Sequence, residues 1–355
     1  MTTDTITDVD DLEALAGPWS ELLGRADASP TVQPRWYLTA ARTLHADEPL
    51  QAPVVMNGAD VTAVVPVVRT RSGHLEVIGS RLLHEPVALA HQDGASLAAA
   101  VDGLMRFGRP AHLGRLTSDG EAVRCLTSLP RHRGLTARRA SKGTPFVPIH
   151  GDWASFEASL SSSRRSSLRR NVRRADEAGG FGFEVRSPEA HDVDHELDDF
   201  VATEHRSWKG PEGTSLAADP LAHSFYRAYA RSSAEAGELR VARLTVGGRL
   251  AGVQLAIERS ARLWILKLGY DEELSACAPG IVLTHETLRW AFERGLEGYE
   301  LLGDEAPWTR IWTDQAHPFT VVRLYPASPR GMKAAVTDVT QHLRKRGRAH
   351  AGSAP

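Results

Sequence analysis

One succession of expected secondary structure occurs twice in this chain of 355 residues, and the repetition restricts the folds available to it. The second-half copy comprises the three strands of an antiparallel meander, a helix and a final strand, at 238–246, 250–258, 263–270, 281–294 and 299–303. The first-half copy has the same elements in the same order, at 53–56, 61–68, 75–79, 96–107 and 111–116. Turns containing Gly247-Gly248 and Asn57-Gly58 are typical of tight hairpins. The repetition predicts an α+β fold of two related domains, each with a mixed, mostly antiparallel sheet flanked by helices.

Length and pattern together predict where these domains end. A chain of 355 residues is long for a single hydrophobic core, so two domains are expected. We place an N-terminal domain at residues 1–150, a second domain at 151–326, and a C-terminal helix with a basic tail at 327–355.

Bulk composition excludes several classes of protein. The formal net charge of −2 gives no overall field that would favour acidic partners. The two cysteines, Cys125 and Cys277, exclude a disulfide scaffold, suit a reducing compartment, and cannot form a zinc site by themselves. No apolar run approaches the ~20 residues of a membrane span, and the first residues do not resemble a signal peptide. We therefore expect a cytoplasmic protein with no metal.

An arginine-rich stretch at residues 161–177 has two interpretations. If the stretch is helical, Arg165 and Arg169 lie on one face of the helix, with further arginines beside them. The first interpretation is a solvated linker helix whose arginines pair with nearby acidic residues. The second is a surface that binds a phosphate-bearing ligand such as CoA, a nucleotide-linked sugar or tRNA.

Several short sequence motifs within residues 153–325 match those of a known family. They are a basic helix (163–171), a helix end with histidine (205–208) and a glycine hairpin (246–252). The others are a Lys-Leu-Gly-Tyr strand (267–271), an Ala-Pro-Gly helix start (278–280) and a Pro-Trp pair (307–308). Together they resemble the GNAT superfamily, and more closely its tandem-domain branch of CelD/FemAB-like acyltransferases. The first half resembles the degenerate N-terminal GNAT-like domain of these proteins through its element order.

Two departures from the family pattern concern ligand binding. The usual glycine-patterned loop that holds the CoA pyrophosphate is replaced by Leu-Ser-Ala-Cys-Ala-Pro-Gly at 274–280, which retains a helix N-terminus. Acetyl-CoA or another acyl-CoA is therefore a cofactor that the resemblance implies, through Ala278, Pro279 and Gly280. Related sequences tend to carry a lysine after the Pro-aromatic pair, where this chain has Thr309 followed by Arg310.

Acyl transfer to an amine needs a base, a donor to the carbonyl oxygen and an acid for the leaving group. The resemblance implies that the strand near Lys267 supplies a backbone N–H to the carbonyl, with Gly269 leaving room for close approach. Tyr270 could protonate a departing thiolate, or simply pack at the strand end. His205 could act as a base, or cap its helix. Glu300 could be a base with a raised pKa, or a solvated edge residue.

Other polar residues could line the substrate. Trp208 is a candidate wall, Gln254 could share a polar face with Lys267, and a rim after the last short strand would be formed by Asp304, Trp308 and Arg310. Lys267, Arg165 and Arg169 could contact the cofactor, whereas solvation is the plainer interpretation of Lys267. His285 shares the apolar face of its helix and is expected in the core.

Three functions remain open at this stage. The first is transfer of an acetyl or acyl group from CoA to an amine or hydroxyl acceptor, small or polymer-linked, in polysaccharide or cell-envelope metabolism. Because no nucleophile elbow, P-loop or metal-ligand cluster occurs in the sequence, direct transfer is expected. The second is an aminoacyl-tRNA-dependent transfer of the FemAB kind. The third is a non-catalytic GNAT-like binding module.

Overall fold

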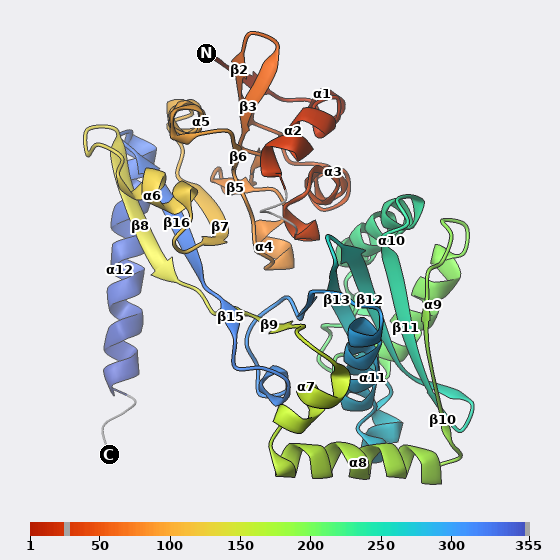
Figure 1. Ribbon diagram of the computed structural model, residues 1–355. Coiled ribbons are helices and arrows are strands. Elements are labelled where there is room, and N and C mark those ends of the chain that lie inside the picture. Colours follow the sequence, from red (N-terminus) through yellow and green to blue (C-terminus); the bar gives the residue numbers. More distant parts are fainter. Residues whose placement is uncertain (25–28, 352–355) are drawn as a thin grey trace. The chain divides into compact units, whose positions relative to one another are not determined.

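The structure is a computed structural model that describes residues 1–24 and 29–351, with side chains described as far as Gln341 (Figure 1). The chain divides into two compact units. Of the described residues, unit 1 contains 1–24, 31–141 and 318–351, and unit 2 contains 29–30 and 142–317.

Unit 2 is built on a seven-stranded sheet of order β10-β11-β12-β13-β14-β9-β15. In chain order its strands are β9 Thr144–Pro148, β10 Phe181–Arg186, β11 Leu239–Val246, β12 Arg249–Arg259, β13 Arg262–Tyr270, β14 Gly298–Glu300 and β15 Ala316–His317. Neighbouring strands are antiparallel except β13 and β14, which are parallel. The predicted meander is therefore β11-β12-β13, and its first turn uses the left-handed backbone of Gly247 and Gly248.

Helices cover both faces of this sheet (Figure 1). They are α7 Trp153–Ser159, α8 Ser162–Glu177, α9 Val193–His205, α10 Pro220–Glu235 and α11 Pro279–Glu293, with 3-10 turns η2 Leu216–Ala218, η3 Glu272–Cys277 and η4 Thr309–Ile311. A Cβ on Gly252 would meet Leu283 of α11, whereas a Cβ on Gly269 would meet Glu204 of α9. Gly252 pairs with Tyr270 across the strands, so both lie on the same face of the sheet. Gly269 precedes Tyr270 on β13 and therefore lies on the other face, so α11 and α9 cover opposite faces.

The core of unit 2 lies under α11. Leu263 and Tyr299 from the sheet and Leu288 and Phe292 from α11 are buried in one cluster. His285 on the same helix is 8% exposed, so it lies in the core as the sequence predicted. Its ring is edge-on to that of Trp153.

Unit 1 contains two sheets, of order β1-β2-β3-β6 and β4-β5-β7-β16-β8. Its strands are β1 Thr2–Ile6, β2 Ala52–Asn57, β3 Asp60–Val64, β4 Val67–Arg69, β5 Leu75–Val77, β6 Ala90–His91, β7 Ala111–Thr117, β8 Gly134–Ala140 and β16 Phe319–Pro326. Its helices are α1 Val9–Glu13, α2 Ala16–Leu23, α3 Pro34–Thr43, α4 Ser80–Leu83, α5 Gly94–Arg106, α6 Glu121–Thr127 and α12 Pro329–Ala351, and the turn η1 Pro30–Val32 precedes α3. The single strand expected at 61–68 is divided between β3 and β4, because Pro66 between them has no N–H for the ladder.

The division into units differs from the sequence-based boundaries at two strands. β9 was placed in the first domain, yet it pairs with β14 and β15 of unit 2. β16 was placed in the second domain, yet it pairs with β7 and β8 of unit 1. The helix of the separate C-terminal segment, α12, packs on β16 and also belongs to unit 1. The side chains of its basic tail lie outside the described residues.

Both units thus have mixed sheets flanked by helices, which confirms the predicted fold class. Within the ranges 1–24 and 29–351, we find no helix with the length and apolar character needed to cross a membrane.

Candidate active site

The parallel strands β13 and β14 separate soon after they begin. They pair only at Arg262 with Gly298, Leu263 with Tyr299 and Trp264 with Glu300. β13 then continues through residues 265–270, and the register with β12 shifts so that Leu266 is an extra residue. A bulge of this kind bends and twists its strand. The second half of β13 therefore has an edge that β14 does not cover.

The backbone alternation of β13 shows which groups face that edge. The amide of Asp271, just after the strand, donates to the carbonyl of Ala251 in β12 at 2.9 Å. Because successive backbone groups of a strand point to opposite sides, the amides of Leu268 and Tyr270 point to the uncovered edge. The Leu268 carbonyl faces the same way, since it accepts a bond from the Lys209 ammonium at 3.0 Å.

A buried ion pair fixes α9 against this part of β13. Glu204 is fully buried; its Oε1 accepts from Lys209 Nζ at 2.7 Å and its Oε2 from the amide of Leu216 at 2.8 Å. A Cβ on Gly269 would lie 2.9 Å from the Cα of Glu204. Gly269 thus makes room for α9, where the sequence suggested room for a substrate carbonyl. Lys209 joins the loop after α9 to the edge of β13.

Sequence reasoning missed both members of this ion pair. The available signal was a carboxylate at Glu204 on the face of α9 that carries the buried Leu197 and Phe200. A buried carboxylate requires a partner, and Lys209 lies shortly afterwards in the chain.

His205 and Trp208 lie at the end of α9 and in the loop that follows. Both are exposed, and Trp208 is 48% exposed. The Nδ1 of His205 lies 3.0 Å from the Oγ of Ser215. A neutral imidazole held on one nitrogen by a hydroxyl has its other nitrogen available for proton transfer.

Tyr270 ends β13 beside the start of α11. A Cβ on Gly280 would lie 3.1 Å from the Tyr270 ring, so helix and ring approach closely there. Burial, followed by the charge and hydrogen bond of Glu272, raises the pKa of the Tyr270 phenol. The phenol therefore remains protonated at neutral pH, as a proton donor must.

The start of α11 differs from a glycine-patterned loop. Ala278 adopts a left-handed conformation with φ 48°, and Pro279 follows at the first helical position. Pro279 has no N–H, and the amides of Ile281 and Val282 donate to the Ala278 carbonyl. Gly280 is therefore the residue of the first turn whose amide can be offered to an anion.

Lys267 and Gln254 do not share a polar face. Lys267 is partly buried, with its ammonium 4.9 Å from the centre of the Tyr226 ring on α10. Gln254 is fully buried, and its Nε2 lies 3.4 Å from both the Thr284 and Tyr299 hydroxyls. Gln254 belongs to the core beneath α11.

Glu300 is not the solvated edge residue that was one of its two interpretations, and charged groups surround it. It is fully buried in β14, bonded to Arg262 at 2.5 Å and 3.1 Å from His317 Nε2. Its carboxylate is therefore committed to an ion pair across the sheet.

The three rim residues lie after β14. Trp308 is 39% exposed, Asp304 lies 3.9 Å from Lys142, and Arg310 lies 3.7 Å from Glu305. Thr309, where relatives tend to have lysine, is buried, and its hydroxyl bonds both the amide and the carbonyl of Ala306. Thr309 has a structural role in closing this turn.

Helix α8 lies beside α11 and η3 (Figure 1). The arginines of α8 have different surroundings. Arg165 donates to the carbonyls of Ala158 and Leu160, closing the end of α7. Arg169 is exposed. Arg174 donates to the Ala276 carbonyl at 3.2 Å, directly before the start of α11. The structure thus brings Arg174, which sequence analysis did not single out, to the candidate phosphate position.

Asp271, after Tyr270, is fully buried and accepts from Arg206 at 2.7 Å and Arg249 at 2.6 Å. Burial acts to raise its pKa, but bonds from Arg206, the Glu273 amide and Arg249 more than offset it, so the pKa lies below its usual value. A carboxyl whose pKa is lowered by folding stabilises the fold above its unfolded pKa, about 3.9. This contribution disappears as the pH falls through the folded pKa.

Replacing Asp271 with asparagine therefore gives a pH-dependent loss of stability. The difference in unfolding free energy between wild type and Asp271→Asn is expected to be constant above about pH 5 and to shrink below about pH 4. Denaturant titrations across this range measure it, with the half-exposed Asp304→Asn as the control. A difference that stays constant down to pH 2.5 would contradict the role of Asp271.

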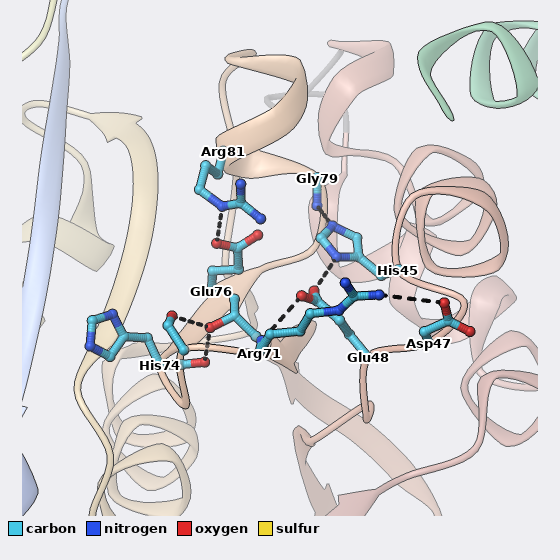
Figure 2. Close-up of polar contacts among 10 residues, drawn as sticks. His45, Asp47, Glu48, Arg71, His74, Glu76, Gly79 and Arg81 are labelled. Atoms are coloured by element: carbon cyan, nitrogen blue, oxygen red, sulfur yellow. Dashed lines mark hydrogen bonds and ion pairs between the residues drawn. The ribbon is translucent and has the colours of Figure 1, made fainter. Parts of the chain in front are cut away.

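A second polar cluster lies in unit 1, where His45, Glu48 and Glu76 come within metal-binding distance of one another (Figure 2). The Gly79 amide donates to His45 Nε2 at 3.0 Å, so a neutral ring carries its proton on Nδ1, which lies 2.7 Å from Glu48. Both ring nitrogens are thereby engaged. Glu48 also accepts from the Arg71 amide at 3.3 Å, so the arrangement fits a hydrogen-bond network that orients the β4–β5 connection.

Comparison with known proteins identifies the fold. Residues 162–310 match the family model described as an acetyltransferase (GNAT) domain. The chain also superposes on FemX (TM-score 0.57, 10% identity, 92% of this chain and 97% of that chain). It superposes on the C-terminal domain of a putative lysylphosphatidylglycerol synthetase from Agrobacterium fabrum (TM-score 0.56, 10% identity, 93% and 96%). A third similar structure is a tandem GNAT protein from the clavulanic acid biosynthesis pathway (TM-score 0.51, 13% identity, 92% and 99%).

At these identities the structural likenesses show the fold alone, and no curated protein matches the sequence. The three structural likenesses define a protein whose fold is that of tandem GNAT proteins. The match of residues 162–310 to the GNAT domain model confirms the family resemblance predicted from the sequence.

Proposed function

We propose that unit 2 transfers an acyl group from an acyl-CoA to an amine or hydroxyl acceptor, without a covalent enzyme intermediate. The observation that carries this proposal is the uncovered edge of β13, where the Leu268 and Tyr270 amides point outward beside the start of α11. An extended thioester chain can bond to such an edge as an added strand does.

The same edge supplies the groups that a donor requires. An amide at Leu268 or Tyr270 would donate to the thioester carbonyl as negative charge develops on its oxygen. The Gly280 amide and Arg174 would face the phosphates of CoA at the start of α11. The exposed Arg169 on α8 would add positive charge on the cofactor side, whereas the ammonium of Lys267 lies over the Tyr226 ring on α10.

In the proposed reaction one side chain takes a proton and another gives one, and both exchange protons with solvent before the next turnover. The acceptor nitrogen or oxygen attacks the carbonyl carbon, and its proton passes to His205. The carbon–sulfur bond breaks, and Tyr270 protonates the departing thiolate to give free CoA. Trp208, Trp308 and Arg310 are proposed to contact the acceptor, a small or polymer-linked molecule of polysaccharide or cell-envelope metabolism. Because acyl-CoA donors are cytoplasmic, we propose that compartment.

Binding of acetyl-CoA tests the donor part of this proposal. Isothermal titration calorimetry should show one acetyl-CoA per chain and, for Arg174→Gln, affinity weaker by about tenfold, the value of one charge-assisted contact. The matched control is Arg289→Gln, near the other end of α11, where Arg289 pairs with Glu293 at 2.8 Å. Equal weakening in both variants, or no binding by wild type, would refute the assignment.

The role of Tyr270 has a separate test. Once an acceptor is found by screening amines for release of the CoA thiol, Tyr270→Phe should lower kcat by about 10²–10⁴-fold, as expected for loss of a general acid. Acetyl-CoA affinity should change little, because the ring is retained. A variant with the full wild-type rate would remove Tyr270 from the mechanism.

One observation favours the alternative of aminoacyl-tRNA-dependent transfer. Arg169, Arg170, Arg173 and Arg174 are all exposed on α8, a surface suited to a phosphate backbone. Binding of an aminoacyl-tRNA that weakens steeply with salt, without any binding of acetyl-CoA, would favour this function.

The third possibility, a non-catalytic binding module, is favoured by the start of α11. Pro279 removes one amide from the position where the family holds a pyrophosphate. A chain that binds neither acetyl-CoA nor aminoacyl-tRNA would fit this interpretation.

A further inference from the structure

Unit 1 contains a cavity of about 570 Å³ that is separate from the residues of the candidate active site. It lies between the first turns of α12, the end of β16 and the segments that precede β5 and β7. Four cationic side chains line it, from Arg109, Arg323, Arg330 and Lys333. A cavity of this size is within the usual range for small-molecule sites.

The carboxylate in the described lining is already engaged. Asp338 on α12 accepts from the Tyr325 hydroxyl at 2.7 Å and from Arg139 at 2.5 Å, and it also bonds Arg323. These bonds, acting against burial, keep the pKa of Asp338 below its usual value. Asp338 therefore remains charged but is shared among several donors, and it does not neutralise Arg109, Arg330 and Lys333.

The cationic groups influence one another. Burial, followed by the charges of Arg330 and Arg69, lowers the pKa of Arg109. Burial, followed by Arg323, lowers the pKa of His112 in the cavity wall to about 4. The Nε of Arg323 is buried and has no hydrogen-bond partner among the described residues. Positive charges that are held together and partly desolvated are stabilised by a bound anion.

We propose that this cavity binds a phosphate-bearing small molecule, with Arg109, Arg330 and Lys333 holding the phosphate. Guanidinium groups match the oxygens of a phosphate in pairs, and the lysine adds a point charge. The neutral His112 and the hydroxyl of Thr337 in the lining supply polar contacts for the remainder of the ligand.

Titration with inorganic pyrophosphate at constant ionic strength tests the site. Wild type should bind it, and the double variant Arg330→Gln with Lys333→Gln should bind at least about tenfold more weakly. Both side chains are exposed on α12, so the fold should be retained; circular dichroism checks this. The control is Arg124→Gln with Arg131→Gln, which removes the same charge from unit 1 outside the cavity.

A further variant separates this site from the proposed donor site of unit 2. If the cavity of unit 1 holds the ligand, Arg174→Gln should retain the pyrophosphate binding that the double variant Arg330→Gln with Lys333→Gln loses. The proposal is overturned if wild type does not bind pyrophosphate, if the control variant weakens binding equally, or if Arg174→Gln abolishes it. Displacement of pyrophosphate by a short single-stranded RNA of higher affinity would instead assign the surface to nucleic acid and would also overturn it.

Discussion

Replacing Lys209 with methionine is expected to lower the free energy of unfolding of unit 2 by about 3–5 kcal/mol. The Glu204 carboxylate is fully buried, and Lys209 supplies the positive charge that lies 2.7 Å from it. Methionine has a similar length but no charge, so the carboxylate would lose its counter-ion in a low-dielectric site. Denaturant unfolding followed by far-UV circular dichroism measures this loss of stability. The expected loss is a large share of the total, because complete domains are usually stable by only about 5–15 kcal/mol.

Two companion variants show whether the buried pair causes this loss. Lys142→Met removes a lysine whose side chain is 69% exposed, and should cost at most about 1 kcal/mol. The double variant Glu204→Leu with Lys209→Met should recover much of the lost stability, because no unpaired charge remains in it. If the double variant is as unstable as the sum of both single replacements, the loss does not come from an uncompensated charge.

Replacing Gly269 with alanine should destabilise unit 2 by about 1–3 kcal/mol, the usual cost of overpacking a tight interior. The new Cβ would lie 2.9 Å from both the Cα and the Cβ of Glu204 and 3.1 Å from its nitrogen. Relief therefore requires α9 to move away from β13. The displacement would also disturb the Lys209 contact with the edge of β13, so acetyl-CoA affinity should fall together with the melting temperature.

The matched control for this variant is Gly182→Ala on β10. Its new Cβ would lie 2.8 Å from the Oγ1 of Thr245, a side-chain atom that can rotate away. Gly182→Ala should therefore lower the free energy of unfolding little, although the crowding distance is similar. Alanine also reduces the conformational entropy of the unfolded chain, which favours the folded state. If both variants show the same loss of stability, the contact between α9 and β13 is not the cause.

The sequence allowed the meander and its helix to be predicted, because alternating apolar residues and glycine turns are local signals. It did not assign β9 and β16 to the correct units. Each strand reads as an ordinary apolar segment, and its sheet is decided by pairing with residues far away in the chain. The division at Pro66 could have been foreseen, since proline inside an expected strand interrupts a ladder.

The candidate site was less predictable than the fold. The family resemblance suggested Tyr270 and Gly280 as site residues, and a Cβ added to Gly280 would lie 3.1 Å from the Tyr270 ring. Arg165 and Arg174 are alike in sequence, but one closes the end of α7 and the other lies before α11. A helical repeat alone cannot distinguish them, because the difference depends on which elements surround α8.

The central claim is that an acyl-CoA lies along the uncovered edge of β13 and at the start of α11. Amide hydrogen exchange, followed by mass spectrometry with and without saturating acetyl-CoA, tests it directly. We predict slower exchange in residues 265–270 and 280–282 when acetyl-CoA is bound. Unchanged exchange in both segments at saturating acetyl-CoA, with protection elsewhere or nowhere, would contradict the claim.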